Sequence, residues 1–160
     1  MTKTGATLKT PATPKGILDL EFAYNTTRTA IVINAWQPST HESFGNIKAA
    51  RLNTYLDFIF LFFYSLFLFF ACKKIARLSN GAFSKVGTLL AKAALIAGFL
   101  DVLENTGMLI TLSGNGTGTI ALFTTTCSVI KWALALTAAA YCLTGLMVVI
   151  SKKKMSLLLA

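Results

Sequence analysis

Acidic residues are scarce in this sequence, and charged residues of either sign are few. It has 6 Asp and Glu residues against 15 Lys and Arg residues, and charged residues make up only 13% of its 160 positions. Because 54% of the residues are hydrophobic, the composition excludes a water-soluble domain. The length accommodates three or four membrane-spanning helices in one domain, so we expect a small all-α integral membrane protein.

Histidine and cysteine are too few and too scattered to predict a metal site. The single histidine, His41, stands among polar residues with no second ligand at a suitable spacing, which is typical of a solvated loop residue. The cysteines Cys72, Cys127 and Cys142 lie in or beside apolar runs and also lack ligand spacing. We interpret them as small buried apolar residues. Neither a metal ion nor any other cofactor is expected.

The basic residues gather at the ends of apolar runs. Lys73, Lys74, Arg77 and Lys85 fall between two such runs, and Lys152–Lys154 follow the last one. Positively charged flanks of this kind face the cytoplasm in most membrane proteins. We therefore predict a multi-pass protein of the cytoplasmic (inner) membrane with a cytoplasmic C-terminus. No soluble basic face with interleaved aromatic residues exists, so nucleic acid is not an expected partner.

Long apolar runs predict three membrane spans, at about residues 52–72, 88–112 and 120–150. The Gly-rich stretch SGNGTG, residues 113–118, separates the last two runs and lacks the Gly-Lys-Ser/Thr ending of a phosphate-binding loop. It is predicted to be a turn. Together these patterns predict a transmembrane helical bundle over residues 51–160.

The N-terminal third has a different composition from the bundle. Residues 1–16 contain almost nothing to bury and predict a flexible tail. Residues 17–50 are predicted to form an extracytoplasmic, interfacial helical segment, with a second short helix beginning near Asn46. If Ile17–Trp36 crossed the membrane as a fourth span, it would bury several charged residues, so we favour a helix at the membrane surface or folded over the bundle.

Ionisable and amide side chains inside the predicted spans mark the candidate site. Asp101, Glu104 and Asn105 are spaced i, i+3 and i+4, which places them on one face of a helix. At 1.5 Å per residue, Asp57 and Glu104 both lie about 22 Å from the inner boundary of the bilayer core, and Lys131 about 28 Å. The helices would thus bring these groups to the outer half of the bilayer. The predicted binding cluster is Asp57, Tyr64, Asp101, Glu104, Asn105 and Lys131, with Glu21, Arg28 and Arg51 as contributors from the outer segment.

The sequence leaves the role of this cluster open. In a structural interpretation, some acids are protonated, Lys131 pairs with the others, and the network locks the helices together. Alternatively, Arg28 or Arg51 folds inward and completes the pairing. In a functional interpretation, the surplus negative charge binds a proton, a cation or a cationic ligand.

Several short stretches resemble a group of small bacterial integral membrane proteins that has no assigned activity. They are LEFA (Leu20–Ala23), INAW (Ile33–Trp36), YLDFIF with Tyr64, AGFLDVLEN (Ala97–Asn105) and Lys131-Trp132, and they cover residues 17–135. The resemblance implies an extramembrane segment with Glu-Leu-Ala or Glu-Phe-Ala followed by Trp, and a span with an Asp-x-x-Glu-Asn motif. It implies nothing about chemistry.

Three functions are compatible with these patterns, and the first is favoured. It is a non-enzymatic binding or membrane-complex assembly role, with membrane lipids as partners and a partner membrane protein or a homo-oligomer as further candidates. The second is an ion- or proton-coupled carrier, which would have to oligomerise because the chain lacks inverted repeats. The third is an intramembrane enzyme with Asp101 and Glu104 as acid and base, assisted by Tyr64 or Lys131. No nucleophile motif supports an enzyme, and we assign no catalytic residue.

Overall fold

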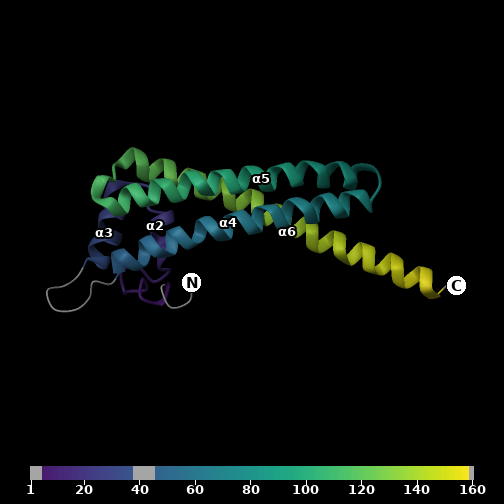
Figure 1. The fold of residues 1–160 in the computed structure, drawn as a ribbon, viewed down its shortest axis with the longest axis horizontal. Coiled ribbons are helices and arrows are strands. Elements are labelled where there is room, and N and C mark those ends of the chain that lie inside the picture. Colours follow the sequence, from purple (N-terminus) through teal and green to yellow (C-terminus); the bar gives the residue numbers. More distant parts are fainter. Residues whose placement is uncertain (1–4, 38–45, 159–160) are drawn as a thin grey trace. The chain divides into compact units, whose positions relative to one another are not determined.

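Three long helices make up most of the computed structural model, which describes residues 5–37 and 46–158 (Figure 1). They are α4 (Asn46–Arg77), α5 (Gly81–Ile110) and α6 (Gly118–Leu158), and each is long and apolar enough to cross a membrane. Within the described ranges, the rest is short helices, turns and one isolated bridge between Thr10 and Thr13. The predicted all-α membrane fold is confirmed. His41, predicted to be a solvated loop residue, lies outside these ranges.

Large apolar side chains remain exposed along the long helices, as expected of a protein surrounded by lipid. On α4, Phe63 is 65% exposed and Phe67 is 69% exposed, and Leu89 on α5 is 67% exposed. In water, apolar patches of this extent would favour association or aggregation. In a bilayer they match the surrounding acyl chains, so the Phe-rich run of α4 needs no role beyond lipid contact and packing.

The helices extend beyond the predicted spans because backbone hydrogen bonding continues past the apolar run into the interfacial sequence. Thus α4 begins at Asn46, where a separate short helix was predicted, and α5 begins at Gly81 rather than near residue 88. The predicted turn between the last two spans is formed by the π-helical turn η1 (Thr111–Asn115) and the residues after it. Gly114 has φ +91° there, a conformation that favours glycine.

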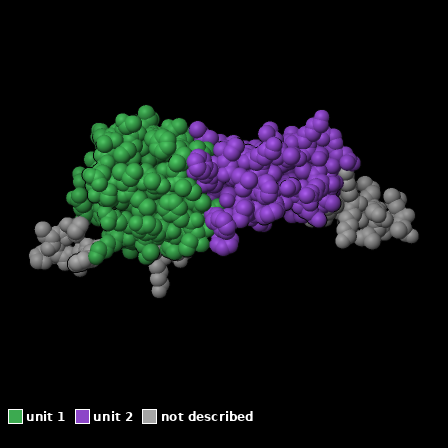
Figure 2. All heavy atoms as spheres, turned by 45° about the horizontal axis from the view of Figure 1, so that its top comes forward, with its two compact units in different colours: residues 1–61, 100–129 green, residues 62–99, 130–160 purple. Residues whose placement is uncertain are grey.

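The chain divides into two compact units, coloured separately in Figure 2. Unit 1 comprises residues 1–61 and 100–129, and unit 2 comprises residues 62–99 and 130–160. Each of the three long helices therefore contributes one part to unit 1 and the other part to unit 2. The described parts of the segment that we predicted over residues 17–50, namely residues 17–37 and 46–50, belong to unit 1 together with parts of all three long helices.

In unit 1, two short helices pack on the long ones. Helix α2 (Ile17–Glu21) and helix α3 (Thr26–Trp36) replace the single helix expected over this stretch. The break is stabilised by Asn25, whose side chain accepts a hydrogen bond from the backbone N–H of Arg28 at 2.8 Å and caps α3. The apolar core of the unit joins α2 and α3 to α4 and α5; its buried members are Leu8, Leu20, Val32, Trp36, Ala50, Met108 and Leu112.

The described part of the predicted flexible tail, residues 5–16, is folded, and here the structure differs from the prediction. Leu8 and Thr13 are fully buried. The indole N–H of Trp36 donates to the Leu8 carbonyl at 3.0 Å, and the Thr13 hydroxyl donates to the same oxygen at 2.8 Å. The polar composition concealed this packing because one leucine and one hydroxyl suffice to fill the space beside a buried tryptophan.

Unit 2 is a three-helix core built on small residues. Cys72 on α4, Ala94 on α5 and Ala138 on α6 are all fully buried. Tyr141 fits over Gly87, where an added Cβ would overlap the Tyr141 hydroxyl, and that hydroxyl donates to the Phe83 carbonyl at 3.1 Å. Small residues at a helix interface let the backbones approach closely, which is how helices associate in a membrane.

Candidate functional site

The polar interior of unit 1 is the candidate site. Asp101, Glu104 and Asn105 on α5 are 2%, 0% and 2% exposed, so the face predicted from their spacing is buried. Ionisable groups are expensive to bury in an apolar setting, so their presence in a span needs a structural or functional reason. Helix α5 places them there because four residues complete slightly more than one helical turn, which keeps all three on one side.

One hydrogen bond joins this face of α5 to α4. The Asn105 side chain donates from Nδ2 to Oδ2 of Asp57 at 2.9 Å. Asp57 is half-buried, and it lies one turn after Asn53 and Thr54, which are both buried. The structure therefore brings together Asp57 and Asn105 of the predicted cluster, and it adds a polar surface of α4 that the sequence analysis did not single out.

Glu21 reaches the start of α6 from the end of α2. Its carboxylate Oε2 accepts a hydrogen bond from the Ser128 hydroxyl at 3.2 Å, and its backbone carbonyl accepts one from the Thr125 hydroxyl at 2.9 Å. Glu21 is only 9% exposed, so α2 places a buried carboxylate against α6. The first part of α6, ALFTTTCSVIK (residues 121–131), contains several hydroxyl side chains, which was the sequence signal for these two partners. No local pattern in the sequence connected these hydroxyl groups with Glu21.

Close packing brings α5 and α6 together in the same unit. A Cβ added at Gly107 would overlap the Thr124 side chain, so the two helices touch at this glycine. Glu104, one turn before Gly107 on α5, is fully buried, and Thr124 and Cys127 on α6 are buried too, at 3% and 4% exposure. The acidic face of α5 therefore lies near the start of α6 as well as near α4.

The two arginines of the outer segment have different environments. Arg51 donates from Nη2 to the Leu112 carbonyl at 2.7 Å, which ties α4 to the last turn before the α5–α6 connection. Arg28 is exposed and lines a surface cavity of about 260 Å³ that Lys15 and Asp19 also line. The hydrogen bond of the Arg28 backbone to Asn25 and the surface cavity that Arg28 lines do not involve the buried carboxyl groups of α4 and α5. A contribution from Arg28 to the cluster therefore stays a prediction.

Tyr64 and Lys131, the remaining members of the predicted cluster, belong to unit 2. Tyr64 is half-buried and packs against the core of that unit. Lys131 is only 6% exposed, and its ammonium lies 5.6 Å from the centroid of the Trp132 ring. Their association with the carboxylates of unit 1 stays a prediction.

The chemistry available in unit 1 is that of hydrogen-bond acceptors and negative charge. Its carboxylates come from α2, α4 and α5, and amide and hydroxyl side chains accompany them. Among the described residues, no three His, Cys, Asp or Glu side chains are grouped closely enough to hold a metal ion. The arrangement suits an occupant that carries a positive charge or N–H donors.

No protein-family model matches the chain, and no curated protein or solved structure matches it either. The resemblance suggested by residues such as Leu20–Ala23 and Ala97–Asn105 therefore receives no support from these comparisons. Function has to be inferred from the geometry and chemistry described above.

Proposed function

We propose that the polar interior of unit 1 is a non-enzymatic binding site through which the protein holds a membrane ligand or assembles with a partner. One observation carries this proposal. Of the 6 acidic residues in this largely apolar chain, Glu21, Asp101 and Glu104 are buried in unit 1. Asp57 is half-buried on the long helix α4 of the same unit, whereas the half-buried Asp19 lies outside the long helices and lines a surface cavity. Ionisable residues inside spans mark binding or transport sites by default.

The carboxylates define the class of occupant. A group that donates hydrogen bonds to several carboxylates, such as the amine of a lipid headgroup or amphiphile, or a basic or amide side chain of a partner helix, complements their charge. Polar side chains of this kind also join helices within membranes, so a partner protein would use the same chemistry. The segment containing α2 and α3 packs on α4 and α5 through the apolar core of the unit, so an occupant would lie beside this segment.

The basic residues support an orientation for this site. Lys73, Lys74, Arg77 and Lys85 flank the α4–α5 connection, and basic flanks face the cytoplasm. In this proposal the protein lies in the bacterial cytoplasmic membrane, its C-terminus is cytoplasmic, and the buried carboxyl groups lie in the outer half of the bilayer. The site would then lie on the side of the membrane from which molecules of the outer leaflet approach.

Native mass spectrometry of the gently solubilised protein tests the proposal. We would compare the wild-type chain with Glu104→Gln, which replaces a fully buried carboxyl group by an amide of nearly the same volume. Asp19→Asn is the matched control, because Asp19 lies outside the long helices and accepts a hydrogen bond from the backbone of Lys15 at 2.7 Å. A bound lipid, amphiphile or protein that Glu104→Gln loses and Asp19→Asn retains supports the binding role and identifies the occupant.

Two other outcomes contradict the proposal. A bare protein in all three samples, with only Glu104→Gln less stable, would make the cluster a structural lock between helices. Thermal stabilisation of the wild type by a small cation, lost in Asp101→Asn, would instead favour an ion- or proton-coupled carrier.

A further inference from the structure

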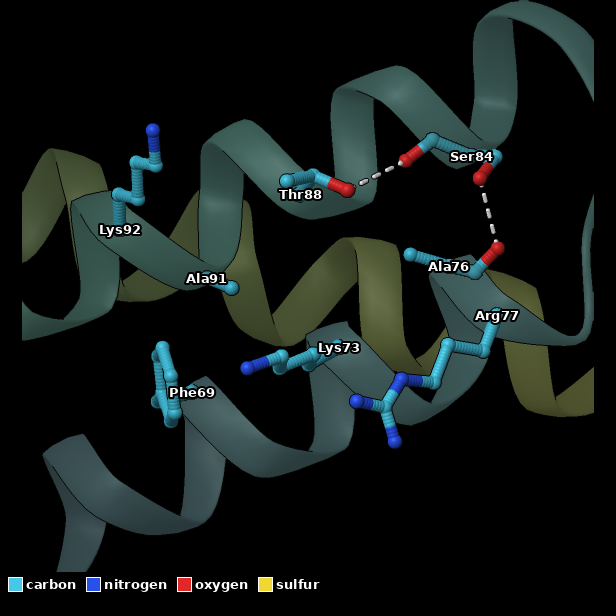
Figure 3. Close-up of a pocket in the computed structure, with 8 residues that line it drawn as sticks. All are labelled: Phe69, Lys73, Ala76, Arg77, Ser84, Thr88, Ala91 and Lys92. Atoms are coloured by element: carbon cyan, nitrogen blue, oxygen red, sulfur yellow. Dashed lines mark hydrogen bonds between the residues drawn. The ribbon is translucent and has the colours of Figure 1, made fainter.

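A second site lies in unit 2, at the end of the α4–α5 hairpin. A cavity of about 230 Å³ lies between the end of α4 and the start of α5. Figure 3 shows the residues that line it. Its lining includes three cationic side chains: Lys73 and Arg77 from α4, and Lys92 from α5. Lys73 and Arg77 are four residues apart, so the helix places them on the same face.

The charge of the cavity is not balanced by acidic residues of its own unit. All 6 acidic residues of the chain fall within the sequence segments of unit 1, so unit 2 contains only basic charged residues. Like charges gathered in one cavity beside apolar surface repel one another, and an anion between them removes that repulsion. Lysine and arginine together are the usual protein ligands of phosphate groups.

The hydroxyl groups in the cavity wall are held by hydrogen bonds, whereas the cationic side chains can change their conformation. The Ser84 hydroxyl donates to the Ala76 carbonyl at 2.7 Å, and the Thr88 hydroxyl donates to the Ser84 carbonyl at 3.1 Å (Figure 3). Because both hydroxyl groups already donate to backbone carbonyls, they form part of the cavity wall and do not serve as hydrogen-bond donors to a ligand. The Lys73 ammonium lies 5.2 Å from the centroid of the Phe69 ring, which holds it beside apolar surface.

In Figure 3 the Lys73 and Arg77 side chains run along the same side of α4, whereas the Lys92 side chain projects from α5 with its ammonium group directed away from them. The long lysine stems can turn their ammonium groups toward an anion without moving the backbone. The cavity is smaller than the roughly 300–1,000 Å³ of pockets for drug-sized molecules, so it suits a headgroup phosphate better than a whole large ligand.

We propose that this cavity binds the phosphate of an anionic phospholipid headgroup through Lys73, Arg77 and Lys92. The shared chemistry is that of any phosphate anion, and the apolar surroundings favour a lipid as its source. Phe70 and Leu89, on the same stretches of α4 and α5, are 62% and 67% exposed and would contact the acyl chains of the bound lipid. Basic pockets between membrane helices bind anionic lipid headgroups in this way.

The test is lipid titration of the full chain in detergent, followed by native mass spectrometry, with phosphatidylglycerol, phosphatidylcholine and inorganic phosphate as separate probes. The test variant is Lys73→Gln with Arg77→Gln. The control is Lys74→Gln with Lys85→Gln, which removes the same charge from exposed positions that do not line the cavity. We expect the wild type to prefer phosphatidylglycerol, and the test variant to bind it at least about tenfold more weakly. The affinity of the control variant for phosphatidylglycerol should fall less than about threefold, since its substitutions change only the electrostatic field around the cavity.

The proposal would be overturned if the two double variants lost the same affinity for phosphatidylglycerol. It would also be overturned if the wild type did not prefer phosphatidylglycerol to phosphatidylcholine. Binding of inorganic phosphate with the same dependence on Lys73 and Arg77, but without lipid preference, would overturn the lipid assignment. If the test variant does not fold, Lys92→Gln serves in its place, because Lys92 is exposed at the rim. It should weaken phosphatidylglycerol binding about fivefold, and an unchanged affinity would count against the cavity.

Discussion

The Asn105 amide on α5 and the Asp57 carboxylate on α4 are joined by a hydrogen bond of 2.9 Å, which makes them the direct link between two long helices in unit 1. Each residue lies in a run that is otherwise mostly apolar. A polar pair of this kind fixes both the rotation of the helices and their relative height, because the bond forms in only one register.

A double-mutant cycle should detect this link. Asn105→Ala and Asp57→Ala are each expected to lower the free energy of unfolding in detergent, with a coupling of about 1 kcal/mol between them. Thr106→Ala is the control, because Thr106 is exposed and its hydroxyl bonds only the Val102 carbonyl of its own helix. Strictly additive effects of the Asn105 and Asp57 changes would show that the bond contributes nothing.

Gly107 should tolerate no side chain while Thr124 is present. A Cβ at Gly107 overlaps the Thr124 side chain, so Gly107→Ala is expected to destabilise the protein by about 1–3 kcal/mol through overpacking. Adding Thr124→Ala removes the overlapping atom and should restore most of the loss. Thermal unfolding of the single and double variants measures this. Failure of Thr124→Ala to rescue the glycine variant would argue against the close contact of α5 and α6.

Trp36 should control the order of the N-terminal residues. Trp36→Phe keeps an aromatic ring in the core but removes the N–H that donates to the Leu8 carbonyl at 3.0 Å, a bond worth about 1 kcal/mol. We expect faster tryptic cleavage after Lys9 and Lys15 and faster hydrogen exchange in residues 5–16, with the long helices unchanged. Tyr24→Phe, at a side chain that is 51% exposed, should leave both measurements as in the wild type.

Cys72 and Cys142 should form a disulfide on mild oxidation. Their Sγ atoms lie 3.3 Å apart on α4 and α6, close enough for a bond after a small movement. Non-reducing peptide mapping should recover the two cysteines linked, and Cys127 should remain available to alkylation after denaturation. A crosslink from Cys127 to either partner would contradict the packing described for unit 2.

The sequence predicted the helices better than their contacts. Apolar runs long enough for a bilayer indicate spans directly, and the spacing of Asp101, Glu104 and Asn105 correctly predicted a shared face that the structure buries. The partnership of Glu21 with Ser128 could not be predicted in the same way. It joins positions 107 residues apart, and such long-range pairing depends on how the whole chain packs rather than on any local period.

Local composition also misled at the N-terminus. A stretch of Thr, Lys, Pro and Gly suggests disorder, yet Leu8 and Thr13 are fully buried because Trp36 offers them a surface and an N–H donor. The break between α2 and α3 depends on the cap at Asn25, a local signal that the predicted single helix did not use. The first feature follows from tertiary contacts and the second from a local cap, and hydrophobic patterning reveals neither of them.

The contact between Glu21 and α6 also sets an order of events during synthesis. A ribosome delivers Glu21 long before Ser128, the residue 107 positions later whose hydroxyl meets its carboxylate. Until α6 is inserted, the Ser128 and Thr125 hydroxyl groups that donate hydrogen bonds to Glu21 in the complete protein are not in place. The contacts of Glu21 with α6 therefore form last, although α2 is made first. A nascent chain arrested before α6 would keep the apolar packing of α2 and α3 on α4 and α5 but would not yet contain the hydroxyl groups that bind Glu21.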